Sequence, residues 1–555
     1  MTRRSAIDAG GGVRPSVEEF SIARQVIKKS RLVAALEPHV DSEVGRPRHL
    51  SLEGLLVAMQ INALRRHHRA HIVQAARTLN AMTPEQRDAL GIRNWDEAEA
   101  YPRVDWLFCR LSRVLDSKEA GIDATGFANA LARAGISSDV ILSTSVAVDG
   151  TDVETWGRLR GASFTIELDG EAAETQLLDD EIVRPKRRVK TAKIFGIGPD
   201  GRKRYTLDPD ARAGHRSSTG QRLAGPYVGY ELHIAVQTRD VRWTNYCDRT
   251  TLGDEVPNVI TTLNLVPAGS HRGRAIVDEL ISYKRNFAEI SDVVWDPGYS
   301  LCQPETTSFP LAAAGIEQTL QPVTHQRGIR PFSGEALLLD GQLYSRFLPA
   351  ELRDLAMPPR FASGAYRRAF EDAFNRRSRW RYVRHRRPDA DGFTRWRCPF
   401  CAGLLRTRSL PKTMRRSRQK PMVTLPEDTR CCRGSLSAPA VELPLTQVIP
   451  FGSTAWRISM NRRQVVESAN AALKGSFVDC ARGFFRVFGR VKISVLLGFT
   501  VAAYNLDRIR SFRANQLQLA SAPKRQPKRR QGTWAEARER YAKALSTKQA
   551  TGPPG

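Results

Sequence analysis

Residues 143–157 read STSVAVDGTDVETWG, and this stretch decides the fold class that we expect for the chain. From about residue 141 the spacing of apolar residues changes from a helical period to a period of two, which predicts a β-strand ending at Asp149-Gly150. The change marks the boundary between a helical region, residues 1–140, and a domain that contains a sheet.

The following segments complete an α/β pattern. A polar insertion at about 157–225 is rich in Arg, Gly and Asp. Residues 227–247 predict strand, turn and strand, residues 271–286 predict a helix, and residues 292–300 predict a short buried strand. This order is typical of an α/β fold, so we expect residues 141–310 to form a mixed sheet flanked by helices.

Residues 1–140 are expected to form a helical N-terminal region. Thr83-Pro84-Glu85-Gln86 has the form of a capping box, and the residues around Trp106 predict an amphipathic helix. Three histidines lie among Arg65, Arg66 and Arg69, but neighbouring guanidinium groups would repel a metal cation. A solvated helix face and a DNA-contacting helix remain the two interpretations.

Residues 311–448 break the α/β pattern and predict an inserted, β-containing subdomain. A hairpin is expected at Asp340-Gly341. Residues 366–388 hold nine arginines with aromatic residues between them. So many arginines repel one another unless a polyanion neutralises them, which favours DNA-backbone contacts over a solvated charged helix. The arginines expected to contact DNA are Arg376, Arg377, Arg379 and Arg381.

Residues 449–515 predict the helices that complete the core, and residues 516–555 form a basic tail. The helix predicted at 461–475 carries four polar residues spaced by four, three and four, which places them within an arc of about 60°. Apolar residues take its other side. The four residues form either the wet face of a surface helix or one wall of a binding site. They are Arg463, Glu467, Asn470 and Lys474.

The charge of the chain indicates a polyanionic partner. Lys and Arg number 86 against 58 Asp and Glu, a net charge of +28. Nucleic acid is the expected partner. An acidic membrane is disfavoured because no basic amphipathic helix is evident, and the apolar stretch at 493–504 is too short to span a bilayer. Eight cysteines and no secretion signal argue against a disulfide framework, so we expect a cytoplasmic protein.

Three acids match the needs of phosphodiester chemistry. Asp149 and Asp296 each end an apolar run and are followed by glycine within two residues, while Glu467 lies on the predicted helix. Such carboxylates could hold Mg²⁺ or Mn²⁺, which prefer hard oxygen ligands. Aspartate before glycine is also common in turns, and Asp152 and Asp292 are rival ligands.

These residues resemble the acids of bacterial insertion-sequence DDE transposases. The family's last motif is Tyr, two residues, Arg, three residues, Glu, six residues, Lys, and Arg463, Glu467 and Lys474 fit that spacing. The tyrosine position is occupied by Met460. The resemblance covers about 141–310 and 449–512.

The resemblance implies a ribonuclease-H-like catalytic core. It implies that Asp149, Asp296 and Glu467 bind catalytic Mg²⁺ or Mn²⁺, and that the chain cleaves and joins DNA at the ends of an insertion sequence. Arg463 and Lys474 would grip backbone phosphates. The implied partners are double-stranded terminal repeats and target DNA. The chain would bind this DNA as a homodimer and would be associated with the bacterial nucleoid.

A second metal site is suggested by cysteine spacing. Cys398 and Cys401 form a CxxC pair, and the adjacent Cys431 and Cys432 follow. Four thiolates could hold a structural Zn²⁺. Free buried thiols and a redox pair remain alternatives.

Two further functions stay open at this stage. A catalytically inactive DNA-binding protein derived from a transposase would explain Met460. A basic, zinc-stabilised transcription or scaffold factor would explain the CxxC pair and the charge, but it leaves the three acids unexplained.

Overall fold

The computed structural model describes the chain in segments. They are residues 12–41, 48–65, 72–158, 194–216, 225–244, 249–330, 332, 336–359, 362–385, 389, 391, 393–407, 421–425, 435–439, 447–478, 480 and 483–521. Met1–Ile509 forms one compact unit, and a second unit begins at Arg510.

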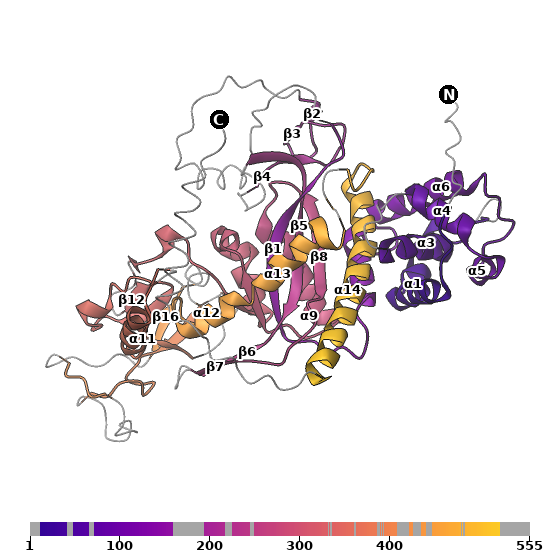
Figure 1. Ribbon diagram of the computed structural model, residues 1–555. Coiled ribbons are helices and arrows are strands. Elements are labelled where there is room, and N and C mark those ends of the chain that lie inside the picture. Colours follow the sequence, from indigo (N-terminus) through magenta and orange to yellow (C-terminus); the bar gives the residue numbers. More distant parts are fainter. Residues whose placement is uncertain are drawn as a thin grey trace, which may run out of the picture. The chain divides into compact units, whose positions relative to one another are not determined.

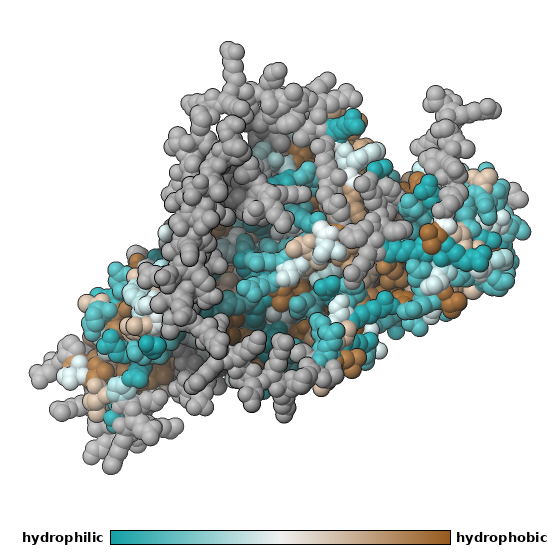
Figure 2. Space-filling model, in the orientation of Figure 1, coloured by the Kyte–Doolittle hydropathy of each residue, from teal (hydrophilic) through white to brown (hydrophobic). Residues whose placement is uncertain are grey.

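Helices make up the regular structure described before residue 140. The capping box predicted at Thr83 is confirmed, because the Thr83 hydroxyl accepts from the Gln86 backbone while the Gln86 side chain accepts from the Thr83 backbone. On the face shown in Figure 2, the visible surface of these helices is mainly hydrophilic. The helices are α1 (Val17–Ser30), α2 (Leu32–Val40), α3 (Leu52–Leu64), α4 (Ile72–Ala81), α5 (Pro84–Ala89), α6 (Ala100–Ser117) and α7 (Ala124–Ala134).

A mixed sheet follows these helices, as the sequence predicts (Figure 1). Its order is β10-β9-β1-β5, with both β4 and β8 paired to β5. β1 is antiparallel to β5 and parallel to β9, and β9 is parallel to β10. The strands are β1 (Ser145–Glu154), β4 (Arg212–Arg216), β5 (Gly225–Thr238), β8 (Ile260–Pro267), β9 (Asp292–Trp295) and β10 (Glu317–Thr319).

Helices cover the sheet on both faces, which confirms a mixed α/β fold. Val146 and Val148 of β1 belong to the apolar cluster of helix α9 (Arg272–Asn286). Ala147, between them, belongs to the cluster of helix α13 (Gln464–Ala471), which packs on β1 and β5 (Figure 1). Burial on both faces explains the nearly continuous apolar run of β1 before Asp149.

One strand boundary is corrected, and one strand pairing is clarified. β1 does not end at Asp149-Gly150 but continues to Glu154, because β5 pairs with it along its whole length. Residues 227–247 form strand, turn and strand as predicted, but the two strands do not pair with each other as a hairpin. β5 pairs with β8, while β6 (Val241–Thr244) pairs with β7 (Arg249–Leu252) as a separate ribbon. The partner of β5 on the side away from β1 is therefore β8, a strand from later in the chain, and not the segment that follows β5 directly.

Between β10 and α12 (Thr454–Asn461), the described residues form two small sheets. The hairpin predicted at Asp340-Gly341 is confirmed, with positive φ at both residues. One sheet has the order β11-β12-β13 and the other β14-β15-β16. Their elements are β11 (Ile329–Arg330), β12 (Ala336–Leu339), β13 (Gln342–Ser345), α11 (Gly364–Ser378), β14 (Val383–Arg384), β15 (Thr394–Arg397) and β16 (Ser435–Ala438).

Short elements connect these parts. In the polar insertion, the described residues include a small ribbon that pairs β2 with β3. Helical turns follow β9 and border the small sheets. These elements are β2 (Gly196–Ile197), β3 (Lys203–Arg204), η1 (Pro297–Leu301), η2 (Pro304–Thr306), α10 (Ser308–Ala313), η3 (Thr324–Gln326) and η4 (Ala350–Leu352).

The helix predicted at 461–475 is interrupted in the structure. Helix α12 (Thr454–Asn461) ends before the turn at Arg462-Arg463, and α13 is followed by a π-helical turn, Ala472–Ser476. α14 (Arg490–Ser521) includes the apolar stretch that was expected to be a core helix. Within the part of the chain that the structure describes, no helix has the length and apolar character needed to cross a membrane.

One buried amide connects α14 to the sheet. Asn505 is fully buried, its Nδ2 donates to the carbonyls of Ala132 (2.9 Å) and Ile260 (2.8 Å), and its Oδ1 accepts from the Ile260 amide (2.7 Å). The side chain therefore satisfies backbone groups of both α7 and β8.

We expect Asn505→Ala to destabilise the protein by about 2–4 kcal/mol, because it leaves three buried backbone groups without partners. The apparent melting temperature measures the effect. Asn515→Ala is the matched control, since Asn515 is an exposed amide on the same helix. Equal melting temperatures for the two variants would contradict the role assigned to Asn505.

Candidate functional site

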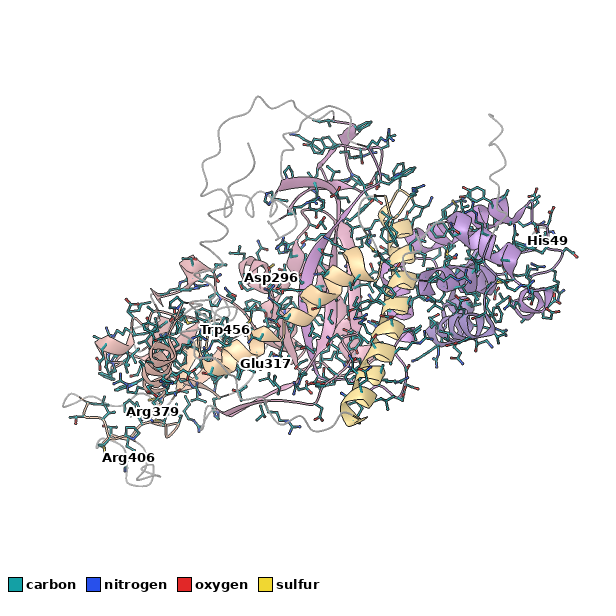
Figure 3. All side chains as sticks on the ribbon, viewed as in Figure 1. His49, Asp296, Glu317, Arg379, Arg406 and Trp456 are labelled. Carbon is teal, nitrogen blue, oxygen red and sulfur yellow. The ribbon has the colours of Figure 1, made fainter. Side chains whose placement is uncertain are left out.

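Parallel pairing of β1 with β9 brings Asp149 and Asp296 together. The last paired residues are Val148 and Trp295, and the two aspartates follow them directly. Asp149 continues along β1, whereas Asp296 leaves its strand and accepts a hydrogen bond from the Gly298 amide at 3.2 Å. Figure 3 shows Asp296 beside the central strands. Two acids separated by 146 residues in sequence thus share one end of the sheet.

The neighbourhood of Asp149 disfavours its charge. Burial, and secondly the carboxylate of Asp296, raise the pKa of Asp149 from 3.8 to about 7. Arg463 and Arg272 act in the opposite direction. Such repulsion between neighbouring carboxylates is what a bound cation would relieve.

The polar residues of α13 face these acids. Arg463 donates from Nη1 to Asp296 at 2.6 Å and pairs through Nη2 with Glu467 at 2.7 Å. Asn470 donates to Asp149 at 3.1 Å, and Lys474 pairs with Asp152. Each of the four residues is therefore connected to Asp149, Asp152 or Asp296, directly or through Arg463, so they are more than the solvated face of a surface helix.

The opposite side of α13 holds this polar row in place. Val466, Ala469, Ala472 and Leu473 are buried in the same apolar cluster as residues of β1 and β5. Lys474 lies in the π-helical turn, whose hydrogen bonds span five residues instead of four. Such turns are frequent at functional sites.

The three predicted metal ligands are not gathered around one point. Glu467 is half exposed and bound to Arg463, whose guanidinium also holds Asp296. Among the described residues, no group of three His, Cys, Asp or Glu side chains is placed to hold a metal ion. The donor chemistry nevertheless suits Mg²⁺ or Mn²⁺, because Asp149 and Asp296 supply adjacent carboxylate oxygens. The positively charged guanidinium of Arg463 already bridges Asp296 to Glu467.

The rival acids have other partners. Asp292 lies at the opposite end of β9 and binds Arg462 at 2.5 Å. Asp152 pairs with Lys474 and with Arg216 at 3.5 Å. Asp292 therefore lies away from Asp149 and Asp296, whereas Asp152 binds the lysine of the polar row.

A buried polar layer on the α9 side of the sheet was missed by the sequence analysis. Glu231 of β5 pairs with Arg272 of α9 at 3.2 Å, and His233 Nδ1 lies 2.7 Å from the Tyr299 hydroxyl. Burial lowers the pKa of His233 to about 4, so this ring is neutral at pH 7. The signal was present in "GYELHIAVQT", where Glu231 and His233 interrupt an apolar strand on one face.

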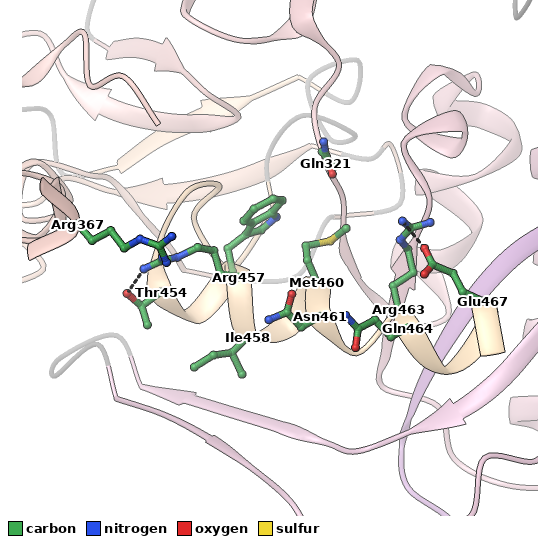
Figure 4. A pocket seen from close by; sticks show the side chains of 11 residues that line it. Gln321, Arg367, Thr454, Arg457, Ile458, Met460, Asn461, Arg463, Gln464 and Glu467 are labelled. Atoms are coloured by element: carbon green, nitrogen blue, oxygen red, sulfur yellow. Dashed lines mark hydrogen bonds and ion pairs between the residues drawn. The ribbon is translucent and has the colours of Figure 1, made fainter. Parts of the chain in front are cut away.

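A pocket of about 660 Å³ lies beside Glu467 along α12 (Figure 4). Its lining is rich in cationic and amide side chains and includes Met460, the residue at the family's tyrosine position. Trp456 adds an aromatic ring whose indole nitrogen donates to the Leu320 carbonyl at 2.9 Å. Other lining residues are Gln321, Arg367, Arg457, Asn461, Arg463 and Gln464.

The arginines predicted to bind DNA divide into two groups. Arg376 and Arg379 are exposed. Arg377 is buried, binds Asp340 at 2.6 Å and lies over the Tyr344 ring, and Arg381 is also buried. Burial leaves little room for DNA contacts at Arg377 and Arg381, and the Arg377 guanidinium already binds Asp340, so DNA binding by these arginines stays a prediction.

Two other sequence predictions lie partly outside the described residues. Cys398 is buried and Cys401 half-buried on one turn, but Cys431 and Cys432 are not among the described residues. In the arginine–histidine cluster only Arg65 is described, and it binds Glu19 at 2.8 Å. The zinc site and the DNA contact of that cluster both stay predictions.

Comparisons with protein-family models, curated proteins and solved structures find no match to this chain. The site is therefore interpreted from its own geometry.

The raised pKa of Asp149 gives a pH-dependent stability. In metal-free protein the folded state keeps a proton on Asp149 up to about pH 7, while the unfolded chain loses it near 3.8. The folded state then binds more protons across this window, so stability falls as pH rises from about 4 to about 7.

We expect Asp149→Asn to remove this loss, so that the variant melts several degrees above the parent at pH 8 and the difference shrinks towards pH 4. Melting temperatures in EDTA measure it. Asp88→Asn, at an exposed position on α5, is the control. A difference that grows towards acid pH would contradict the assignment.

Proposed function

We propose that the chain is a DDE transposase, which cleaves DNA strands at the ends of an insertion sequence and joins them to a target with divalent metal ions. The observation that carries the proposal is the meeting of Asp149 and Asp296 on neighbouring parallel strands, with the Arg463–Glu467 pair facing them from α13.

The sheet supports a ribonuclease-H-like core. Two parallel strands, β9 and β10, lie on one side of β1, and two antiparallel strands, β5 and β8, lie on the other. This is the arrangement expected of such a core. The first acid lies on its central strand β1 and the second at the end of the neighbouring parallel strand.

The chemistry that the proposal needs is metal-assisted phosphodiester cleavage and transesterification. Mg²⁺ or Mn²⁺ bound by the carboxylates would activate a water or a 3′-hydroxyl and stabilise the leaving oxygen. Asp149 and Asp296 provide fixed carboxylates at a strand end, and Asn470 holds Asp149 in place at 3.1 Å. Glu467, on the helix opposite, would complete the ligand set.

Arg463 would couple DNA binding to completion of this ligand set. Its guanidinium holds both Asp296 and Glu467. A backbone phosphate that enters the pocket competes for the same donors, since arginine binds phosphate as well as carboxylate in bidentate geometry. We infer that Arg463 moves to the phosphate and frees the two acids.

The DNA path would follow α12. Three arginines of the pocket lining, Arg367, Arg457 and Arg463, offer positive charge next to Glu467, and the whole chain carries +28. Non-specific attraction to double-stranded DNA follows from such a surface. Because two element ends must be joined, the active complex would contain two copies of the chain.

A second candidate is an inactive DNA-binding protein derived from such an enzyme. Two features favour it: Arg463 occupies the carboxylates of both Asp296 and Glu467, and Met460 stands at the family's tyrosine position. Cleavage assays separate the two functions.

We expect Asp149→Asn, Asp296→Asn and Glu467→Gln each to reduce cleavage of terminal-repeat DNA with Mn²⁺ by roughly 100-fold or more, because metal ligation contributes several kcal/mol to transition-state stabilisation. Glu289→Gln is the control, since Glu289 is an exposed acid after helix α9 that pairs with Lys284. Wild-type protein that binds this DNA without nicking it would favour the inactive candidate.

Replacing Arg463 tests its bridge directly. We expect Arg463→Gln to bind Mn²⁺ at least about tenfold more tightly than the parent without DNA, because one positive charge leaves the carboxylates, and to bind DNA more weakly. Isothermal titration with Mn²⁺ and a DNA shift assay measure both effects. The control Arg457→Gln should weaken DNA binding without changing Mn²⁺ affinity. An unchanged Mn²⁺ affinity of Arg463→Gln would refute the idea that phosphate and the two carboxylates compete for Arg463.

A further inference from the structure

Two glycines next to the aspartates have no obvious role in chain reversal. Gly150 follows Asp149 inside β1, where it pairs with His233 of β5. Gly298 lies in the turn after Asp296. Neither is among the described glycines with positive φ, so the backbone at these positions does not require glycine.

Space is the reason for both glycines. A Cβ on Gly150 would lie 2.7 Å from Glu231 Oε1 and 3.2 Å from the His233 ring. A Cβ on Gly298 would overlap Nη1 of Arg272. The glycines therefore leave room for the two members of one ion pair, Glu231 and Arg272, which are joined at 3.2 Å.

The same geometry brings Arg272 close to the acids. The position of a Cβ on Gly298 is 3.4 Å from Asp296 Oδ2 and 2.2 Å from Arg272 Nη1, so this guanidinium lies near the carboxylate. Arg272 therefore approaches Asp296 from the α9 side, while Arg463 binds Asp296 from α13. Electrostatic attraction to Arg272 also favours the charged form of Asp149.

We propose that Arg272 is a positioning residue of the acid site: anchored by Glu231, its guanidinium serves as a built-in counter-charge that holds Asp149 and Asp296 side by side. This inference rests on the proposed function for its catalytic meaning, but its electrostatic part does not. Arg463 can be drawn away by a phosphate, whereas Arg272 is held by a buried carboxylate and stays. The pair of acids then keeps a cation beside it at every stage.

The proposal explains which chemistry Arg272 would and would not perform. Arg272 lies on the face of the sheet opposite to α13, so it would not contact substrate. It acts through Asp296, by fixing the direction of that carboxylate, and through the total charge of the cluster. A purely structural arginine would stabilise α9 and Glu231 without any dependence on the charge of Asp296.

A double-mutant cycle in metal-free protein at pH 8 separates these roles. The variants are Arg272→Gln, Asp296→Asn and the double variant, and the readout is the apparent melting temperature in EDTA. We expect Asp296→Asn to recover at least a third of the loss caused by Arg272→Gln, because neutralising one acid removes the repulsion that the arginine balanced. Additive losses would overturn the proposal.

Arg274 provides the matched control. It is an exposed arginine on the same helix, so Arg274→Gln combined with Asp296→Asn should be additive. Arg272→Lys should retain more stability than Arg272→Gln, since it keeps the charge. Equal losses for Lys and Gln, together with additivity in the cycle, would leave Arg272 as a packing residue only.

The catalytic part is tested by strand cleavage at saturating Mn²⁺. We expect Arg272→Gln to cleave at least tenfold more slowly than the parent and Arg272→Lys to restore most of the rate. A parent protein that does not cleave would refute the proposed function, while the metal-free cycle would still decide whether Arg272 balances the acids. Full activity in Arg272→Gln would overturn the positioning role.

Discussion

The parallel pairing of β1 with β9 is the constraint on which the site depends. It ends at Val148 and Trp295, so the next residues, Asp149 and Asp296, must lie next to each other. Burial and, secondly, repulsion from the neighbouring Asp296 carboxylate raise the pKa of Asp149 to about 7. Much of the surrounding structure supplies positive charge or hydrogen-bond donors to these acids.

That compensation comes from both faces of the sheet. On the α13 face, Arg463 and Asn470 donate to Asp296 and Asp149. On the α9 face, Arg272 is held by Glu231, in space that Gly150 and Gly298 leave open. The apolar side of α13 fixes the position of the first group, so packing and electrostatics serve the same end.

The basic character of the chain has more than one structural use. Arg377 is inside the small subdomain, where Asp340 and an aromatic ring accept its charge. Arg462 joins the start of β9 to the turn after α12. A high number of arginines therefore indicates a polyanionic partner only when the buried arginines are left out of the count. The density of arginine in the sequence did not distinguish the exposed Arg376 from the buried Arg377.

The sequence by itself determined the elements and the candidates. Periodicity identified the helical N-terminal part, the mixed α/β core, the hairpin at Asp340 and the capping box at Thr83. The three acids and the polar row on α13 were also identified, because local spacing fixes which residues share a face. Strand partners were not determined, since the partner of β5 is set by contacts between distant segments. Only the tertiary structure showed that Arg463 closes over two acids and that Glu231 and Arg272 lie behind them, because these contacts depend on side-chain distances across the sheet, which no local pattern encodes.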